Sequence, residues 1–317
     1  MDPRTYLRRA LIFVLVGMVI YFGAYLAAEK LVYDRTKRNR FFLVKTISPT
    51  TYDFVILGAS HAMILSFEDM NDRLEKMTGG KIINLATLGS GIVPNQLFLD
   101  YLLMKHKTGA VVYLLDSGPF MKRAANEGRL NDAELFNRAP FDPELVKLLW
   151  SYYSRDLIEI NPILDYVLGF SKINNDKRFQ ADLHEMELIF RKRYRPDIKQ
   201  IKERISSTDP AVVDQKLFDR YVSLFAQMID SLRSQNIKVL ACRPALPKMY
   251  RDNKPNENLF DDRMQALLAE KQVPFKDFSR AMPDYQWYFD TDHLNQKGVP
   301  IFFENHFKPF LVENAPR

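Results

Sequence analysis

Residues 53–62 read DFVILGASHA, an apolar run followed by a glycine, a serine and a histidine. A short apolar run of this kind is typical of a strand buried in a parallel sheet, and the glycine indicates that the strand ends abruptly. We therefore expect Ser60 at a turn from a strand into a helix. The glycine permits a tight backbone there, and free N–H groups at the helix start face any oxyanion. This is how a serine nucleophile is presented, although phosphate-binding and ordinary turns share the pattern.

The same strand pattern recurs along the chain and alternates with helical patterns. Further apolar runs cover residues 81–86, 110–115, 237–242 and 273–278, and helical periodicity covers residues 66–77, 95–107, 211–235 and 258–271. Strands that alternate with helices predict an α/β fold, here a flavodoxin-like doubly wound parallel sheet. In such a sheet a ligand binds beyond the carboxyl ends of the strands, at the switch point.

One connection is much longer than the others. The link from Ser117 to about Pro210 far exceeds an ordinary α/β connection of roughly 2–6 residues plus a helix. Its apolar, aromatic and amphipathic stretches predict an inserted, mainly helical cap over residues 119–210. The cap lies either beside the active face or elsewhere as a stabilising decoration.

Composition excludes several classes of protein. The chain has 317 residues, of which 47% are hydrophobic and 26% charged, so neither intrinsic disorder nor a disulfide-stapled miniprotein is expected. Cys242 is the single cysteine, so the chain forms no internal disulfide. The net charge of +6 is spread out and accompanies no nucleic-acid-binding motif, so we expect no nucleic-acid partner.

The N-terminal region contains nineteen uncharged residues, 10–28. As a helix they are about 28 Å long, close to the ~30 Å hydrocarbon thickness of a bilayer. We predict an uncleaved transmembrane anchor, with a signal peptide or a buried core helix as alternatives. Basic residues flank the run on both sides, so charge does not decide its orientation. The expected organisation is an anchor over residues 1–29, a linker over 30–50 and a catalytic domain over 51–317.

Two further elements accompany Ser60. Gly89 lies in a glycine-containing loop after the second strand, where a backbone N–H can approach a reacting carbonyl. Asp290 and His293 form a D-x-x-H motif before the last helix, residues 299–312. This spacing lets Asp290 hold Nδ1 of His293 while Nε2 accepts a proton from Ser60. Asp292 competes with Asp290 for that role.

The order of these elements resembles the SGNH/GDSL hydrolase superfamily. Ser60, Gly89 and His293 correspond to its first, second and fifth blocks, and Asp290 to its triad acid. The resemblance covers residues 51–317 and implies a serine esterase or acyltransferase with Ser60, Asp290 and His293 as catalytic residues. The N–H groups of Ser60 and Gly89 are then the implied oxyanion donors.

The third block departs from the family pattern. The family has Gly-x-Asn-Asp there, whereas residues 115–119 read LDSGP. No asparagine supplies the third oxyanion donor, and a charged Asp116 would repel an oxyanion. Ser117 or a backbone N–H is the expected replacement.

The anchor, the G-x-S-H turn and the D-x-D-H-L-N ending together resemble the DltD-like and alginate-acetylation-like branch. This resemblance implies a single-pass protein of the cytoplasmic membrane with an extracytoplasmic catalytic domain. It also implies O-acyl transfer to an anionic or polysaccharide polymer of the cell envelope, with a multipass membrane-bound O-acyltransferase as partner. The alternative is a catalytically weak scaffold or polymer-binding subunit of such a complex.

Two more side chains are expected near the site. His61 follows the nucleophile and is predicted to line the substrate pocket, although a helix-terminal surface position fits it equally. Arg243 ends the fourth strand and is predicted to contact an anionic substrate, with a salt bridge as the alternative. The sequence predicts no metal site and no cofactor.

Overall fold

The computed structural model describes residues 2–36, 38–48, 50–132, 135–175 and 185–316. The chain divides into two compact units. Unit 1 comprises Met1–Thr46 and Asn131–Asp182, and unit 2 comprises Ile47–Leu130 and Leu183–Arg317.

Unit 2 is built on a five-stranded sheet in the order β2-β1-β3-β4-β5. The strands are β1 (Thr51–Leu57), β2 (Ile82–Asn84), β3 (Lys107–Leu114), β4 (Lys238–Arg243) and β5 (Phe275–Asp277). Every neighbouring pair is parallel. This order is that of a flavodoxin-like doubly wound sheet, so the predicted α/β fold class is confirmed.

The pairing of β1 places the site. β1 lies between β2 and β3, with Ile56 opposite Asn84 and Leu57 opposite Tyr113. Residues 54–57 are at most 3% exposed, which explains why this part of β1 is an unbroken apolar sequence. Because all strands are parallel, the loops after β1, β2 and β3 leave the sheet at the same edge.

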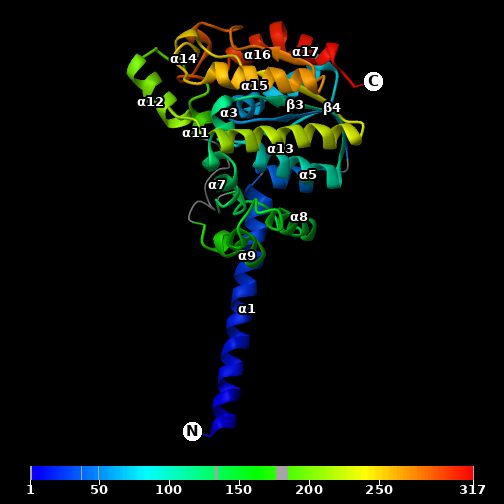
Figure 1. The fold of residues 1–317 in the computed structure, drawn as a ribbon. Coiled ribbons are helices and arrows are strands. Elements are labelled where there is room, and N and C mark those ends of the chain that lie inside the picture. Colours follow the sequence, from blue (N-terminus) through cyan, green and yellow to red (C-terminus); the bar gives the residue numbers. More distant parts are fainter. Residues whose placement is uncertain (1, 37, 49, 133–134, 176–184, 317) are drawn as a thin grey trace. The chain divides into compact units, whose positions relative to one another are not determined.

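Helices cover both faces of the sheet (Figure 1). One layer contains α4 (Met70–Thr78), α16 (Gly298–Phe302) and α17 (Lys308–Glu313), and the other contains α5 (Ile92–Lys105), α13 (Gln215–Ser234) and α15 (Glu257–Glu270). α13 begins four residues later than predicted. Its N-cap is Asp214, whose side chain accepts the Leu217 N–H at 3.1 Å.

The predicted final helix over residues 299–312 is interrupted. A π-helical turn, Phe303–Phe307, separates α16 from α17. Pro309 follows in the first turn of α17 and has no N–H to continue the α-helical ladder, which accounts for the change of helical geometry. Further helices in the described part of unit 2 are α3 (Ser60–Met63), η1 (Ile64–Ser66), α6 (Ser117–Phe120), η2 (Arg123–Ala125), α7 (Glu127–Leu130), α11 (Glu185–Leu188), α12 (Ile198–Thr208), α14 (Lys248–Arg251) and η4 (Tyr285–Trp287).

The segment predicted as one inserted cap, residues 119–210, belongs to both units. Its central part forms α8 (Pro143–Tyr153), α9 (Ile160–Leu168) and α10 (Phe170–Ile173) in unit 1. The part around α11 and α12 belongs to unit 2. The division arises because α10 pairs with the N-terminal helix through Lys172 and Glu29.

Unit 1 also contains the apolar N-terminal helix. α1 runs from Pro3 to Arg35, with Asp2 as its N-cap, and α2 covers Arg40–Thr46. α1 is long and apolar enough to cross a membrane: its most apolar window has a mean hydropathy of 2.4 and none of it is buried. The predicted linker over residues 30–50 is not an extended tether, because α1 continues through its first part and α2 packs Phe41 and Val44 into the interior.

Candidate active site

The turn after β1 presents Ser60. Gly58 has φ +144°, and a Cβ at this position would lie 2.9 Å from the Leu114 carbonyl oxygen on β3. Only glycine fits such a conformation and such a close approach. The Gly58 N–H donates to Oδ1 of buried Asn95 at 3.0 Å, which ties the turn to α5. α3 then starts directly with Ser60 at the carboxyl edge of the sheet.

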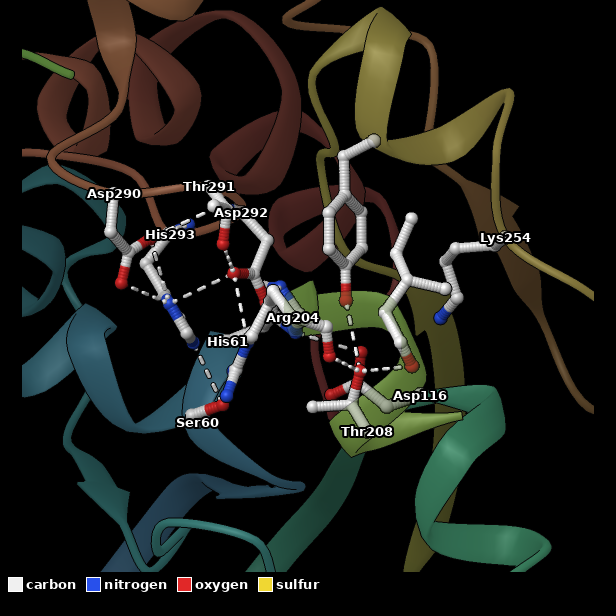
Figure 2. Close-up of polar contacts among 12 residues, drawn as sticks. Ser60, His61, Asp116, Arg204, Thr208, Lys254, Asp290, Thr291, Asp292 and His293 are labelled. Carbon is white, nitrogen blue, oxygen red and sulfur yellow. Dashed lines mark hydrogen bonds and ion pairs between the residues drawn. The ribbon is translucent and has the colours of Figure 1, made fainter. Parts of the chain in front are cut away.

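Ser60, His293 and Asp290 form a hydrogen-bonded row (Figure 2). His293 Nε2 lies 2.8 Å from Ser60 Oγ, and His293 Nδ1 lies 2.9 Å from Asp290 Oδ2. The imidazole is 1% exposed and the serine 6%. The structure therefore brings the three predicted catalytic residues together with the geometry of a nucleophile, a base and an orienting acid.

The motif itself orients the acid. The backbone N–H groups of Asp292 and His293 donate to Asp290 Oδ1 at 3.1 Å and 2.8 Å. These bonds lie within four consecutive residues, so the D-x-x-H spacing determines them without help from the rest of the fold. Asp290 thus faces Nδ1 before Ser60 is brought into place.

Asp292 is a second carboxylate beside the same imidazole. Its Oδ1 lies 3.6 Å from His293 Nδ1, farther than Asp290. Arg204 of α12 binds it through Nε and Nη2, each at 3.2 Å, and Thr291 Oγ1 donates to it at 2.6 Å. Burial alone raises the pKa of Asp292, but His293, His61 and Arg204 outweigh burial and hold the pKa well below its usual range.

His61 does not line an open pocket as predicted. Its Nδ1 lies 2.8 Å from Asp116 Oδ1, its Nε2 lies 3.4 Å from Asp292 Oδ2, and its ring stacks on His293 with centroids 4.7 Å apart. Neither nitrogen is aligned for a hydrogen bond, so both contacts are ion pairs. Because both nitrogens face carboxylates and the residue is 8% exposed, neither is directed at a substrate.

The two ion pairs keep His61 charged. Burial alone lowers the pKa of His61, but Asp116 and Asp292 outweigh burial and raise the pKa to about 10. In return, burial alone raises the pKa of Asp116, and His61 outweighs it, so this carboxyl is ionised. The repulsion expected from Asp116 in place of an asparagine is thus compensated by the residue that follows the nucleophile.

Two backbone N–H groups in the turns after β1 and β2 are candidate oxyanion donors. In the part of the chain that the structure describes, the N–H groups of Ser60 and Gly89 donate no hydrogen bond. Gly89 has φ +64° and follows β2, the neighbour of β1. Ser117 is not the third donor through its hydroxyl. It is fully buried, and its Oγ contacts the carboxylates of Asp209, at 3.2 Å, and Glu257.

Arg243 is not placed to bind substrate either. It is 3% exposed, and its Nη1 and Nη2 bind Asp261 and Glu257 of α15. Lys254 joins the same cluster through Asp209 at 3.2 Å. Two cations and three carboxylates pair within this cluster, so Arg243 makes the salt bridge that was the alternative expectation.

A group of metal-ligating residues occurs at the site. His61, Asp292 and His293 each offer one ligand atom, and these three atoms lie within 4.8 Å of one another. A cation there would have to displace the proton of His61 and the guanidinium of Arg204, which already neutralise Asp292. The donor set is therefore a poor fit for a metal ion.

The sequence did not indicate that Arg204 belongs to the site. It lies 88 residues before Asp292 in a charged stretch with several other arginines and lysines. No spacing or flanking residue distinguishes it from these. Only the position of α12 against the loop at Asp292 does so.

The sequence matches no protein-family model and no curated protein sequence. Two solved structures share the general arrangement. A putative acylhydrolase from Bacteroides fragilis has a TM-score of 0.43 and 11% identity, covering 87% of this chain and 95% of its own. A GDSL-like lipase from Bacteroides thetaiotaomicron has a TM-score of 0.39 and 10% identity, covering 81% and 86%.

We expect the thermal unfolding midpoint to fall as the pH rises from 7 towards 10. The pKa of His61 rises from 6.5 to about 10 on folding, so its contribution is complete below pH 6.5 and is lost as the pH passes through 10. At about 1.4 kcal/mol per pKa unit the change is on the order of a few kcal/mol. Circular dichroism melts of the detergent-solubilised full chain should show a flatter profile for His61→Gln.

His306→Gln is the matched control for that measurement. The pKa of His306 is lowered by burial and by Lys276, so it carries no charge between pH 7 and 10 and its loss should leave the slope unchanged. Equal slopes for the wild type and His61→Gln would contradict the charged state of His61.

Proposed function

We propose that this chain is a serine esterase or acyltransferase of the SGNH type with Ser60 as nucleophile. The observation that carries the proposal is His293, which contacts Ser60 Oγ at 2.8 Å through one ring nitrogen and Asp290 at 2.9 Å through the other. A buried imidazole between a hydroxyl and a carboxylate is the arrangement that activates a serine.

The reaction follows from these contacts. His293 Nε2 takes the Ser60 proton while Oγ attacks the carbonyl carbon of an acyl donor. Asp290 accepts the Nδ1–H bond and stabilises the imidazolium. The N–H groups of Ser60 and Gly89 stabilise the oxyanion, and His293 then returns its proton to the leaving alcohol.

The acyl-enzyme is released by the reverse sequence. An acceptor hydroxyl gives its proton to His293 and attacks the Ser60 ester, which transfers the acyl group and restores the serine. Water as acceptor makes the chain an esterase, and a polymer hydroxyl makes it a transferase. Asp116 and Asp292 fix the charged His61. Its ring stacks on one face of the His293 ring and so helps to hold the base in position.

The setting of this chemistry is also a proposal. α1 is the support for a single-pass anchor in the cytoplasmic membrane. Together with the resemblance to the DltD-like branch, it supports a catalytic unit outside that membrane. The substrate is then a hydroxyl-bearing, anionic or polysaccharide polymer of the cell envelope.

Such a transferase needs an acyl source. Activated donors such as acyl-CoA are cytoplasmic, so the acyl group has to be handed across the bilayer. We propose that a multipass membrane-bound O-acyltransferase provides this step, and that α1 anchors the chain in the same membrane as that partner.

The catalytic assignment is tested on a small acyl ester and with a fluorophosphonate probe. We expect the probe to label the wild type, and Ser60→Ala and His293→Ala each to reduce ester hydrolysis by at least about 1000-fold because nucleophile and base act as a unit. Ser66→Ala, a nearby serine bonded only to the Met63 carbonyl, should retain activity.

Asp290→Asn should retain a measurable remnant above Ser60→Ala. The acid chiefly orients the imidazole, and the Asp292 carboxylate remains 3.6 Å from Nδ1. Full activity of His293→Ala would contradict the triad. A folded wild type that neither reacts with the probe nor cleaves the ester would instead favour the scaffold function.

The topology is tested with paired reporters fused after Arg317. A reporter that is active only outside the cytoplasm should give signal, and one that is active only inside should be silent. The reverse result would remove the envelope polymer as a substrate.

The partner is tested by mild detergent extraction and affinity purification. The wild type should recover a multipass acyltransferase. A variant whose residues 10–28 are replaced by an unrelated spanning helix should recover less of it. Recovery of the protein alone, with polymer acylation unchanged in a deletion strain, would leave a free-standing esterase.

A further inference from the structure

Helix α9 of unit 1 has two apolar faces. Ile163 and Tyr166 are at most 1% exposed and point into the unit. On the other side Leu164, Val167 and Leu168 follow the i, i+3, i+4 spacing of a helical stripe and are 45%, 37% and 55% exposed. A second, exposed apolar stripe of this kind is unfavourable in water.

The exposed stripe continues into the next helix. Phe170, in the first turn of α10, is 59% exposed. We call Leu164, Val167, Leu168 and Phe170 the α9–α10 face. Four adjacent large apolar side chains exposed on one surface mark a contact with a partner or a membrane rather than scattered surface residues.

Two contacts fix the position of the α9–α10 face along α1. Tyr21 Oη donates to the Leu168 carbonyl at 2.9 Å, and the Tyr25 ring packs so closely on Gly169 that a Cβ there would lie 2.3 Å from it. Tyr21 is inside the uncharged run of residues 10–28. Seven residues separate it from the end of that run, which corresponds to about 10 Å along a helix.

The charges at this height are neutralised within the unit. Glu29, which ends the uncharged run, pairs with Lys172, a residue that is 2% exposed, and accepts the Phe141 N–H at 3.1 Å. Asp165, the acidic residue of α9, accepts the Ser171 N–H at 2.9 Å. These ion pairs and hydrogen bonds leave the α9–α10 face apolar.

We propose that the α9–α10 face inserts into the interfacial layer of the phospholipid bilayer that α1 crosses. The inference rests on the proposed membrane anchor. Amphipathic helices at an interface bury their apolar face about 5–10 Å below the headgroup boundary, and the contact at Tyr21 places Leu168 at that depth beside the spanning helix. Unit 1 is then held to the membrane by two elements, the spanning helix α1 and the α9–α10 face at the interface.

A spin label at single cysteines tests the depth of this face. The full chain is labelled at Leu168→Cys or Phe170→Cys and reconstituted in vesicles of phosphatidylcholine and phosphatidylglycerol. The native Cys242 is fully buried in the sheet, so unmodified protein serves as the background. Val16→Cys reports on α1, and Val212→Cys, at a residue that is 85% exposed in unit 2, is the matched control for an apolar side chain in water.

We expect labels at residues 168 and 170 to be accessible to oxygen and protected from a water-soluble nickel chelate, intermediate in depth between residue 16 and the surface. Residue 212 should show the opposite accessibility. If the nickel chelate reaches residues 168 and 170 but not residue 16, the α9–α10 face does not insert into the bilayer, whereas α1 still spans it. Nickel access at residue 16 would contradict both the insertion and the span. Protection of 168 and 170 from both reagents would indicate a protein contact and also overturn the proposal.

Discussion

The contact between Ser60 Oγ and His293 Nε2 joins two turns that are 233 residues apart in the chain. Ser60 follows β1 and His293 follows β5, and in a sheet of parallel strands the chain leaves every strand at the same edge. The turn at Gly58 places Ser60 at the start of α3, and the D-x-x-H turn directs the imidazole towards its hydroxyl. The chemistry proposed here depends on this one distance.

Burial of charge is the second constraint on the site. Two buried carboxylates belong to the site: Asp292 lies beside the catalytic imidazole of His293, and Asp116 lies beside His61, at 0% and 7% exposure. Isolated buried charges are costly, and these are compensated by the cations His61 and Arg204. The residue after the nucleophile thus permits an aspartate at the position where the SGNH/GDSL pattern that the sequence resembles has an asparagine.

Much of the fold was predictable because its signals are local. Each of the five apolar runs overlaps a strand of the sheet, and the periodic segments between them overlap α4, α5, α13 and α15, with ends that differ by up to four residues. The errors occur where a cap or a proline changes the helix, as at Asp214 and Pro309. The division of residues 119–210 between two units was not predictable, because it depends on which distant helix each part packs against.

The sequence by itself determined the elements whose hydrogen bonds close within a few residues: the glycine turn before Ser60 and the carboxylate at i−3 that orients His293. Tertiary structure alone decided the roles of His61, Ser117 and Arg243, which were expected to face a substrate or an oxyanion. Their partners, Asp116, Glu257 and Asp261 among them, come from other strands and helices. A buried polar side chain satisfies its charge or its hydrogen bonds with whatever the fold brings close, and sequence spacing carries no record of that neighbourhood.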